Sequence, residues 1–174
     1  MSQLLELLKQ RRSIRKYQDQ KVEQEKIAQL LKAWEIAPSG KNLKSCELVI
    51  LQNRELIRQL ALCKATSTAA MDTAPLVFVI LGDKEKSDVW IEDCAIVSTI
   101  LQEEAADLGL GSCWIQMRLR SSGTAPSEDA IRKLLNIPDR YGILCAVTVG
   151  YPAETKEPYS DPVPNPSKLH YETF

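Results

Sequence analysis

Two stretches of almost unbroken apolar sequence, residues 74–82 and 141–151, constrain the fold of this chain more than any other feature. Each has the length of a strand, and neither carries a polar face that could meet solvent. Strands of this kind lie in the interior of a sheet that is covered on both sides. Residues 46–52 and 111–117 are also predicted to be strands. The sequence therefore predicts a central sheet of about four strands.

Helical signals fall before, between and after these strands. Helices are predicted over residues 2–10, 22–37, 53–64, 87–108 and 126–135. Pro38 ends the second helix because the residue before a proline avoids the helical region, Asn53 is suited to cap the third, and Gly109 is suited to end the fourth. Because helices and strands alternate irregularly, we expect an α+β fold with a mixed sheet flanked by helices.

The length of 174 residues predicts one domain, which we place at residues 1–152. Five prolines from Pro152 onward exclude regular structure from most of residues 153–174. This extended tail nevertheless ends in apolar side chains, among them Tyr171 and Phe174. We expect the tail either to fray or to pack on a partner subunit.

Composition argues against several classes of protein. A net charge of -1 does not suit a dedicated nucleic-acid binder, and no apolar run approaches the ~18 residues that span a bilayer. The first residues lack the apolar core of a signal peptide, so export is not expected. The five cysteines contain no CxxC pair, and His170 is the only histidine, which gives little support to a zinc site or a cysteine nucleophile. We expect reduced, mostly buried thiols in a cytoplasmic protein.

A basic cluster, Arg-Arg-Ser-Ile-Arg-Lys-Tyr, occupies residues 11–17. If the preceding helix ends near this point, Arg11, Ser13 and Arg15 can converge on one small anion, and guanidinium groups make bidentate contacts to phosphate oxygens. The alternative is a solvated helix end whose cations complement the helix dipole. The cluster alone favours this second interpretation, but the motifs further along the chain favour the first.

Four motifs occur in order along the chain. The basic cluster is followed by Ala-Pro-Ser-Gly-Lys-Asn at residues 37–42, Leu-Gly-Leu-Gly-Ser-Cys-Trp-Ile at 108–115 and Val-Gly-Tyr-Pro at 149–152. With the predicted elements between them, they resemble the FMN-dependent nitroreductase family over about residues 4–152. The resemblance implies a homodimer with a nitroreductase-like fold and FMN bound at the subunit interface.

The resemblance also implies which residues contact the cofactor. The phosphate, ribityl chain and pyrimidine edge of FMN would be held by Arg11, Arg12, Ser13 and Arg15. A turn that reaches the flavin from the other subunit is matched by Pro38, Ser39 and Asn42, although such residues are also common turn formers. The strand end beside the isoalloxazine ring, where a backbone N–H faces N5, is matched by Ile115, Gln116 and Met117.

Three positions depart from the family pattern. Residues 43–46, Leu-Lys-Ser-Cys, stand where the family commonly has Gln-Pro-Trp. Met117 replaces a frequent glycine, so its side chain would either crowd the flavin edge or point elsewhere. Lys156 is what remains of a Lys/Arg pair, so phosphate binding is expected to depend on Arg11 and Arg15, with Lys156 as a helper.

The implied activity is a ping-pong cycle. NAD(P)H would give hydride to FMN and leave, and a nitroaromatic, a quinone or a similar small acceptor would then bind the same face. We name no catalytic side chain, because the flavin carries the chemistry. Adjacent Glu92 and Asp93 lie on different faces of a helix, so they are expected to be solvated or bonded to a neighbouring loop.

Two further expectations accompany this assignment. The acceptor face would be shaped by residues 64–74 and 118–126, and the three tryptophans are expected in the core or an interface. The alternative function is a protein on the same fold that binds or stores flavin, or serves as an interaction module, without efficient turnover.

Overall fold

The four predicted strands form a single sheet in this computed structural model, which describes residues 2–174. The strands are β1 (Cys46–Leu51), β2 (Leu76–Asp83), β3 (Gly111–Gln116) and β4 (Tyr141–Gly150), in the spatial order β1-β2-β4-β3. Every residue of β2 and β4 is buried, as their apolar sequences predict for central strands. The edge strands of the sheet are β1 and β3.

The prediction of a mixed sheet is wrong for these strands, because all three neighbouring pairs run antiparallel. Among the described residues, the parallel pairing is a one-residue bridge between Ser13 and Ser112. The reason for the difference is topological. The alternation of helices and strands along a chain leaves strand direction open, since direction depends on the end of the sheet to which each connection returns.

The predicted helices are all present to within a few residues at their ends. They are α1 (Gln3–Gln10), α2 (Gln24–Ile36), α3 (Arg54–Leu62), α4 (Trp90–Asp107) and α5 (Ser127–Leu135). Asn53 caps α3 as predicted, since its side chain accepts from the backbone N–H of Leu56. Gly109 follows the end of α4 with a φ of +73°, a conformation that glycine adopts without strain.

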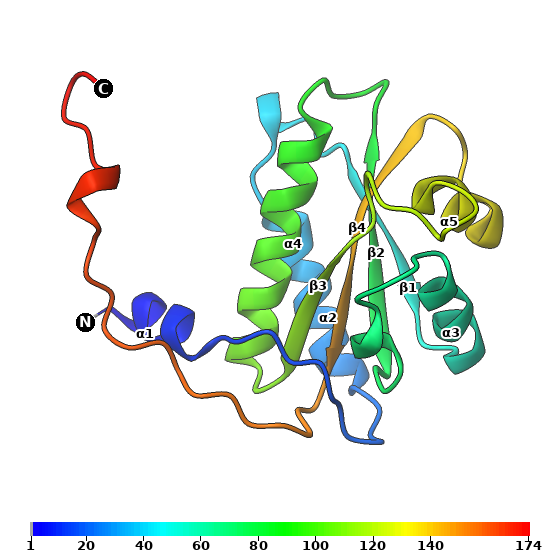
Figure 1. The fold of residues 1–174 in the computed structure, drawn as a ribbon, viewed down its shortest axis with the longest axis horizontal. Coiled ribbons are helices and arrows are strands. Elements are labelled where there is room, and N and C mark those ends of the chain that lie inside the picture. Colours follow the sequence, from blue (N-terminus) through cyan, green and yellow to red (C-terminus); the bar gives the residue numbers. More distant parts are fainter. Residues whose placement is uncertain (1) are drawn as a thin grey trace.

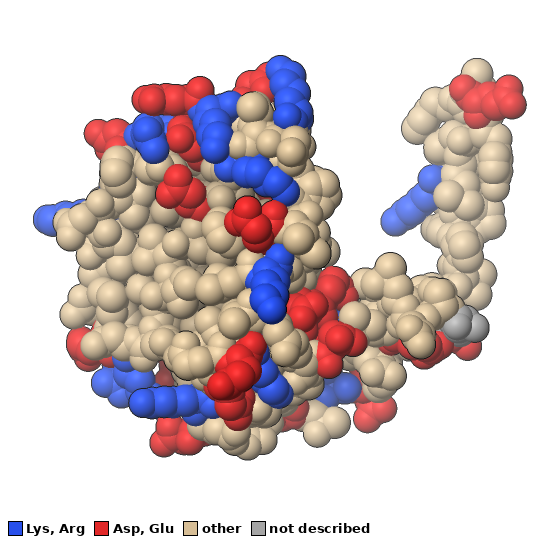
Figure 2. Space-filling view, turned by 180° about the vertical axis from the view of Figure 1, so that it is seen from behind, with Lys and Arg blue, Asp and Glu red and all other residues tan. Residues whose placement is uncertain are grey.

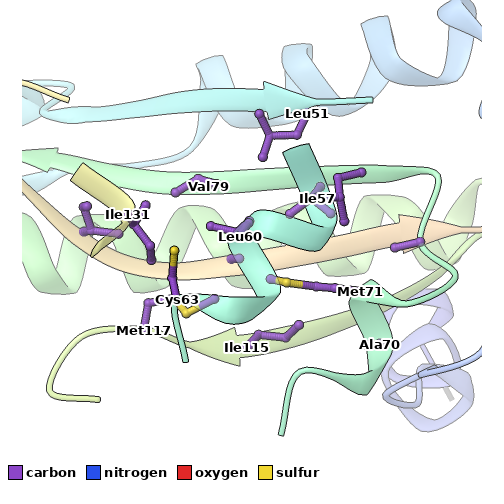
Figure 3. Packing of buried hydrophobic residues seen from close by; sticks show 14 of the residues in the cluster. Leu51, Ile57, Leu60, Cys63, Ala70, Met71, Val79, Ile115, Met117 and Ile131 are labelled. Carbon is purple, nitrogen blue, oxygen red and sulfur yellow. The ribbon is translucent and has the colours of Figure 1, made fainter. Parts of the chain in front are cut away.

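Helices cover both faces of the sheet (Figure 1). Alternate residues of β2 point to opposite sides, so that Phe78 packs with α2 and α4 while Val79 packs with α3 and α5. The side of α3 and α5 holds a dense apolar cluster (Figure 3). The tryptophans at positions 34, 90 and 114 pack against the core on the other side. No helix among residues 2–174 is long and apolar enough to cross a bilayer.

The tail after Pro152 is extended apart from a short turn at Pro166–Lys168, and it leaves the body of the molecule (Figure 1). Its first part runs beside α1, where the N–H of Tyr159 donates to the carbonyl of Lys9 at 2.9 Å. The side chain of Lys9 also pairs with Asp161 at 2.6 Å. Beyond this point the tail exposes its apolar side chains, including Tyr171 and Phe174.

Candidate functional site

The basic cluster is docked along the start of edge strand β3. Helix α1 ends at Gln10, and the chain becomes extended, with the N–H of Ile14 donating to the carbonyl of Ser112 at 2.9 Å. Tyr17 stabilises the segment, since its buried hydroxyl donates to the carbonyl of Ile14 at 2.6 Å. A side chain at Gly111 would collide with Ile14, so glycine permits this close approach. The segment is therefore an ordered extension of the sheet and not a solvated helix end.

Three cations line a cavity of about 220 Å³ on one side of this segment, which we call the small basic cavity. They are Arg11, Arg12 and Lys156, and its other walls come from α1, the end of α4 and the backbone around Ser112. No carboxylate lines it. The predicted helper Lys156 thus lies beside the two arginines.

Both arginines of this cavity are held in place by neighbours. The Nε of Arg11 lies 3.4 Å from Glu103 of α4, and both side chains are less than a quarter exposed. Burial raises the pKa of Glu103, and the charge of Arg11 partly offsets this. Arg12 donates to the carbonyl of Glu157 and stacks on the ring of Tyr159 at 4.5 Å. The tail therefore orders one wall of the small basic cavity.

A second cavity, of about 490 Å³, lies along the outer edge of β3, and we call it the strand-edge cavity. It is lined by Arg15, Lys64, Ser67, Ala69, Ala70, Cys113, Trp114, Ile115, Gln116 and Arg120. On this side of β3 the bridge at Ser112 pairs only the first part of the strand, so the outer edge of residues 113–116 has no neighbouring strand in the described chain. A flat ligand can therefore meet both side chains and strand backbone here.

Arg11, Ser13 and Arg15 all act on the thiol of Cys113, but the two arginines line different cavities and do not share one small anion site as the basic cluster predicts. Burial raises the pKa of this thiol, while Arg15, the Ser13 hydroxyl and Arg11 act to lower it. This point lies between the two cavities, because Ser112 belongs to the lining of one and Cys113 to that of the other.

The three predicted residues at the end of β3 differ in what they present. Ile115 and Gln116 line the strand-edge cavity. The amide of Gln116 is fixed, because it accepts from the indole of Trp114 at 3.0 Å and donates to the carbonyl of Arg118 at 3.0 Å. The side chain of Met117 is fully buried in the cluster beside α3 and α5 (Figure 3) and lines neither cavity. Of the two expected orientations, it therefore points away.

The turn that holds Pro38, Ser39 and Asn42 lies at the other end of α4 (Figure 1). Its Gly40 contacts Asp93 near the start of this helix, whereas the basic cluster contacts Glu103, about 15 Å further along it at the helical rise. Within one subunit the fold does not bring the turn and the basic cluster to the same site. Pro38 and Ser39 line a separate apolar groove of about 500 Å³ between α2 and β1.

Asp93 holds this turn from inside the protein. Its side chain is buried, and one oxygen accepts from the N–H of Gly40 at 2.7 Å. The other accepts from the hydroxyls of Ser45 at 2.8 Å and Ser87 at 3.1 Å. The expectation of a solvated carboxylate is wrong here, and the alternative of a bond to a neighbouring loop is confirmed. Its neighbour Glu92 is exposed.

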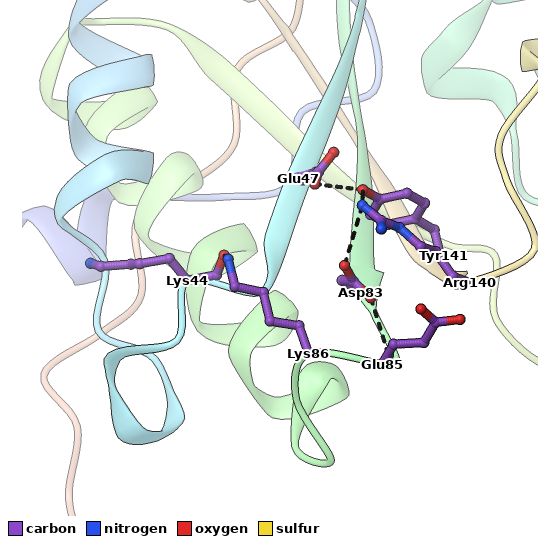
Figure 4. Close-up of polar contacts among 7 residues, drawn as sticks. All are labelled: Lys44, Glu47, Asp83, Glu85, Lys86, Arg140 and Tyr141. Atoms are coloured by element: carbon purple, nitrogen blue, oxygen red, sulfur yellow. Dashed lines mark hydrogen bonds and ion pairs between the residues drawn. The ribbon is translucent and has the colours of Figure 1, made fainter.

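Lysines complete the support of the turn and explain its unusual sequence. Lys44 donates to the carbonyl of Ala37 at 2.8 Å and so satisfies the end of α2. Lys86 donates to the carbonyl of Lys44 at 3.2 Å (Figure 4). At the same end of the sheet, Arg140 forms an ion pair with Asp83, and the hydroxyl of Tyr141 donates to Glu47 (Figure 4). Residues 43–46 therefore serve as the anchor of the turn.

Four residues of this region were not singled out as binding residues from the sequence: Lys64, Asp93, Glu103 and Arg120. Each is a common charged residue in a helix or loop, and nothing in its local pattern separates it from solvated neighbours. Among residues 2–174 no three His, Cys, Asp or Glu side chains are placed to hold a metal ion. All five cysteines are buried, which confirms the expected burial of the thiols.

Comparison with known proteins gives the same family from independent observations. A model described as the Nitroreductase family matches residues 8–68 and 62–151. An FMN-dependent nitroreductase from Clostridium difficile R20291 shares the fold with a TM-score of 0.94 and 41% sequence identity, over 98% of this chain and 99% of its own.

Two curated relatives extend this comparison. A protein of Archaeoglobus fulgidus with the provisional name NADH dehydrogenase/NAD(P)H nitroreductase is 31% identical over 100% of both chains. The FMN reductase (NAD(P)H) of Bacillus subtilis strain 168 is 24% identical over 100% of this chain and 75% of its own.

Proposed function

This chain belongs to the nitroreductase family, and from that premise we propose that it is an FMN-dependent oxidoreductase that uses NAD(P)H to reduce small oxidised acceptors. The observation that carries the proposal is the pair of cavities on either side of Ser13. One is small and basic, and the other is larger and follows an open strand edge. FMN has the matching parts, a phosphate and a flat ring system.

The residues that line the two cavities support the proposal. Arg11, Arg12 and Lys156 supply cations for a phosphate that carries close to two negative charges, and guanidinium groups keep their charge at any physiological pH. The hydroxyl of Ser13 lies between this phosphate site and Arg15, which faces the larger cavity. The outer edge of β3 offers backbone groups that a strand holds rigid, which suits hydrogen bonds to the polar edge of a ring.

When bound, FMN supplies the transfer of hydride from NAD(P)H to the acceptor. The protein then needs to bind, orient and shield the reacting rings. Gln116 is locked by two hydrogen bonds and gives the cavity a fixed polar wall. Ile115 gives it an apolar wall that excludes water. Since neither cavity is lined by a carboxylate or a histidine, we assign no acid or base to this chain.

We place the complete site between two copies of the chain. The turn with Pro38, Ser39 and Asn42 lies too far along α4 to serve the basic cluster of its own subunit, so it would serve the cluster of a second subunit. The tail, residues 153–174, would pack on the same partner, which would cover the apolar side chains that it exposes. The five unpaired thiols suit the reducing cytoplasm, where we place the enzyme.

The acceptors that we propose are nitroaromatics, quinones and similar small rings, reduced in a ping-pong cycle. The alternative of flavin storage without turnover depends on the departures from the family pattern at residues 44–46 and at Met117. Neither still supports it, because Met117 packs in the core and residues 43–46 anchor a turn. Steady-state reductase activity no greater than that of free FMN would restore the alternative.

The decisive experiment is anaerobic reduction of the purified holoprotein. We expect NADH or NADPH to bleach the flavin absorption, and an added quinone to restore it. A variant with Lys32→Gln, on the exposed side of α2 and away from both cavities, is the control. A protein that neither carries FMN nor binds it in a calorimeter would overturn the proposed function.

A further inference from the structure

The strand-edge cavity holds two cations that the binding of FMN phosphate does not use. Lys64 follows the end of α3, and Arg120 follows β3, yet both line this cavity together with Arg15. The residues that follow them are tied to each other, because the N–H of Ala65 donates to the carbonyl of Ser121 at 2.9 Å. The N–H of Arg120 also donates to the carbonyl of Met117 at 3.1 Å. The pair of cations is therefore built into the fold.

These cations have no carboxylate partner in the described part of the chain. None of Arg15, Lys64 and Arg120 forms an ion pair with a carboxylate in residues 2–174, and no Asp or Glu lines the cavity. Glu154 accepts from the backbone N–H of Arg15 and forms its ion pair with Lys156, not with the guanidinium of Arg15. Burial and the charge of Arg120 lower the pKa of Lys64. The two like charges therefore repel, and a bound anion would relieve that repulsion.

An anion bound by Lys64 and Arg120 would not be the phosphate of FMN. That phosphate has its own cations in the small basic cavity, Arg11, Arg12 and Lys156, on the other side of the Ser13–Ser112 bridge. The strand-edge cavity is instead the place where the proposed function puts the reacting rings. An anionic group bound in this cavity would therefore belong to the molecule that reacts with the flavin there.

We propose that Lys64 and Arg120 bind an anionic substituent of the acceptor, so that the enzyme prefers aromatic acceptors with a carboxylate, sulfonate or phosphate over neutral acceptors of the same shape. This inference rests on the proposed function, since it assigns a substrate class to the same site. The guanidinium of Arg120 provides the planar, bidentate contact, and Lys64 adds a point charge that is partly withdrawn from water.

The test compares two acceptors that differ in charge but hardly in shape, 4-nitrobenzoate and 4-nitrobenzamide. With saturating NAD(P)H, the wild-type holoenzyme is expected to have the lower KM for 4-nitrobenzoate. Lys64→Gln and Arg120→Gln should each raise that KM roughly 10-fold to 100-fold, as expected for losing one charged hydrogen-bonding partner. The ratio of the KM for 4-nitrobenzoate to the KM for 4-nitrobenzamide should therefore rise in both variants. The control Lys32→Gln should change neither KM.

A binding measurement separates recognition from turnover. Benzoate, which the enzyme does not reduce, should bind the oxidised holoenzyme in a calorimeter and should bind both variants more weakly by the same factor. Equal affinity of benzoate for wild type and both variants would overturn the inference, whatever the activity shows.

Two further outcomes identify other sources of the anion, and two more separate failure of the inference from failure of the proposed function. If the variants lose affinity for FMN but not for riboflavin, Lys64 and Arg120 bind the cofactor phosphate and the inference fails. If they lose only the use of NADPH relative to NADH, the pair binds the nucleotide, and the inference fails again. If the wild type reduces neither acceptor although it binds FMN, the proposed function itself fails. Activity with 4-nitrobenzamide but without charge discrimination refutes only the inference.

Discussion

Replacing Asp93 tests how the turn at residues 38–45 is held. Asp93→Ala removes a buried carboxylate that accepts from Gly40, Ser45 and Ser87. Three hydrogen bonds to a charged group are worth about 1.5–3 kcal/mol each, but the variant also avoids the cost of burying the carboxylate. We therefore expect a net loss of about 3–5 kcal/mol in the free energy of unfolding, the usual effect of breaking a buried charged network.

Asp93→Asn separates the roles of charge and shape. The amide oxygen still accepts from the N–H of Gly40, and the hydroxyls of Ser45 and Ser87 can rotate to accept from the amide N–H groups. We expect this variant to lose only about 1–2 kcal/mol. Glu92→Ala is the matched control, since the adjacent side chain is exposed, and its effect should stay within about 0.5 kcal/mol.

Two measurements check the result. Urea unfolding gives the three free energies, and limited trypsin digestion reports on the turn itself, because exposed Lys41 becomes a cleavage site once the turn opens. Asp93→Ala should be cut there much faster than Asp93→Asn or the control. If Asp93→Ala unfolds at the same urea concentration as Glu92→Ala, the carboxylate does not stabilise the turn and the argument is refuted.

Four other predictions follow from the same structure. Arg15→Ala should weaken FMN binding by ~1.5–3 kcal/mol in a calorimeter, while Arg58→Ala on the exposed side of α3 should leave it unchanged. Gly142→Ala should cost about 1–3 kcal/mol in urea unfolding, because the added methyl group would collide with the indole ring packed on this glycine. Burial raises the pKa of Glu103, so the folded state holds this proton more tightly than the unfolded chain does. Ionising it should therefore lower stability as the pH rises above about 4.3, and Glu103→Gln should remove that fall in urea midpoints measured between pH 4 and pH 7. Deleting residues 163–174 should weaken self-association in sedimentation experiments, and an unchanged dissociation constant would show that the tail does not bind the partner.

Local chemistry explains why the elements could be predicted from the sequence. The apolar runs of β2 and β4 require burial on both faces wherever they lie, and the structure buries both strands completely. The helix caps could also be predicted from the sequence, because Asn53 and Gly109 act on backbone groups within a few residues of themselves.

The positions that sequence reasoning missed depend on residues far apart in the chain. The antiparallel sheet follows from where each connection returns, and no residue pattern records that. The sequence left two orientations open for Met117, and packing against the cluster beside α3 and α5 decides between them, although its neighbour Gln116 lines a cavity.

The sequence by itself determined which segments are helices, which strands are buried and where cations concentrate, since each property depends on neighbours along the chain. Only the tertiary structure decided that Asp93 is buried beneath a turn some fifty residues earlier and that Lys64 and Arg120 share one cavity. An isolated charged residue looks the same in sequence whether it is solvated or buried. Its surroundings are set by contacts that exist only after the chain has folded.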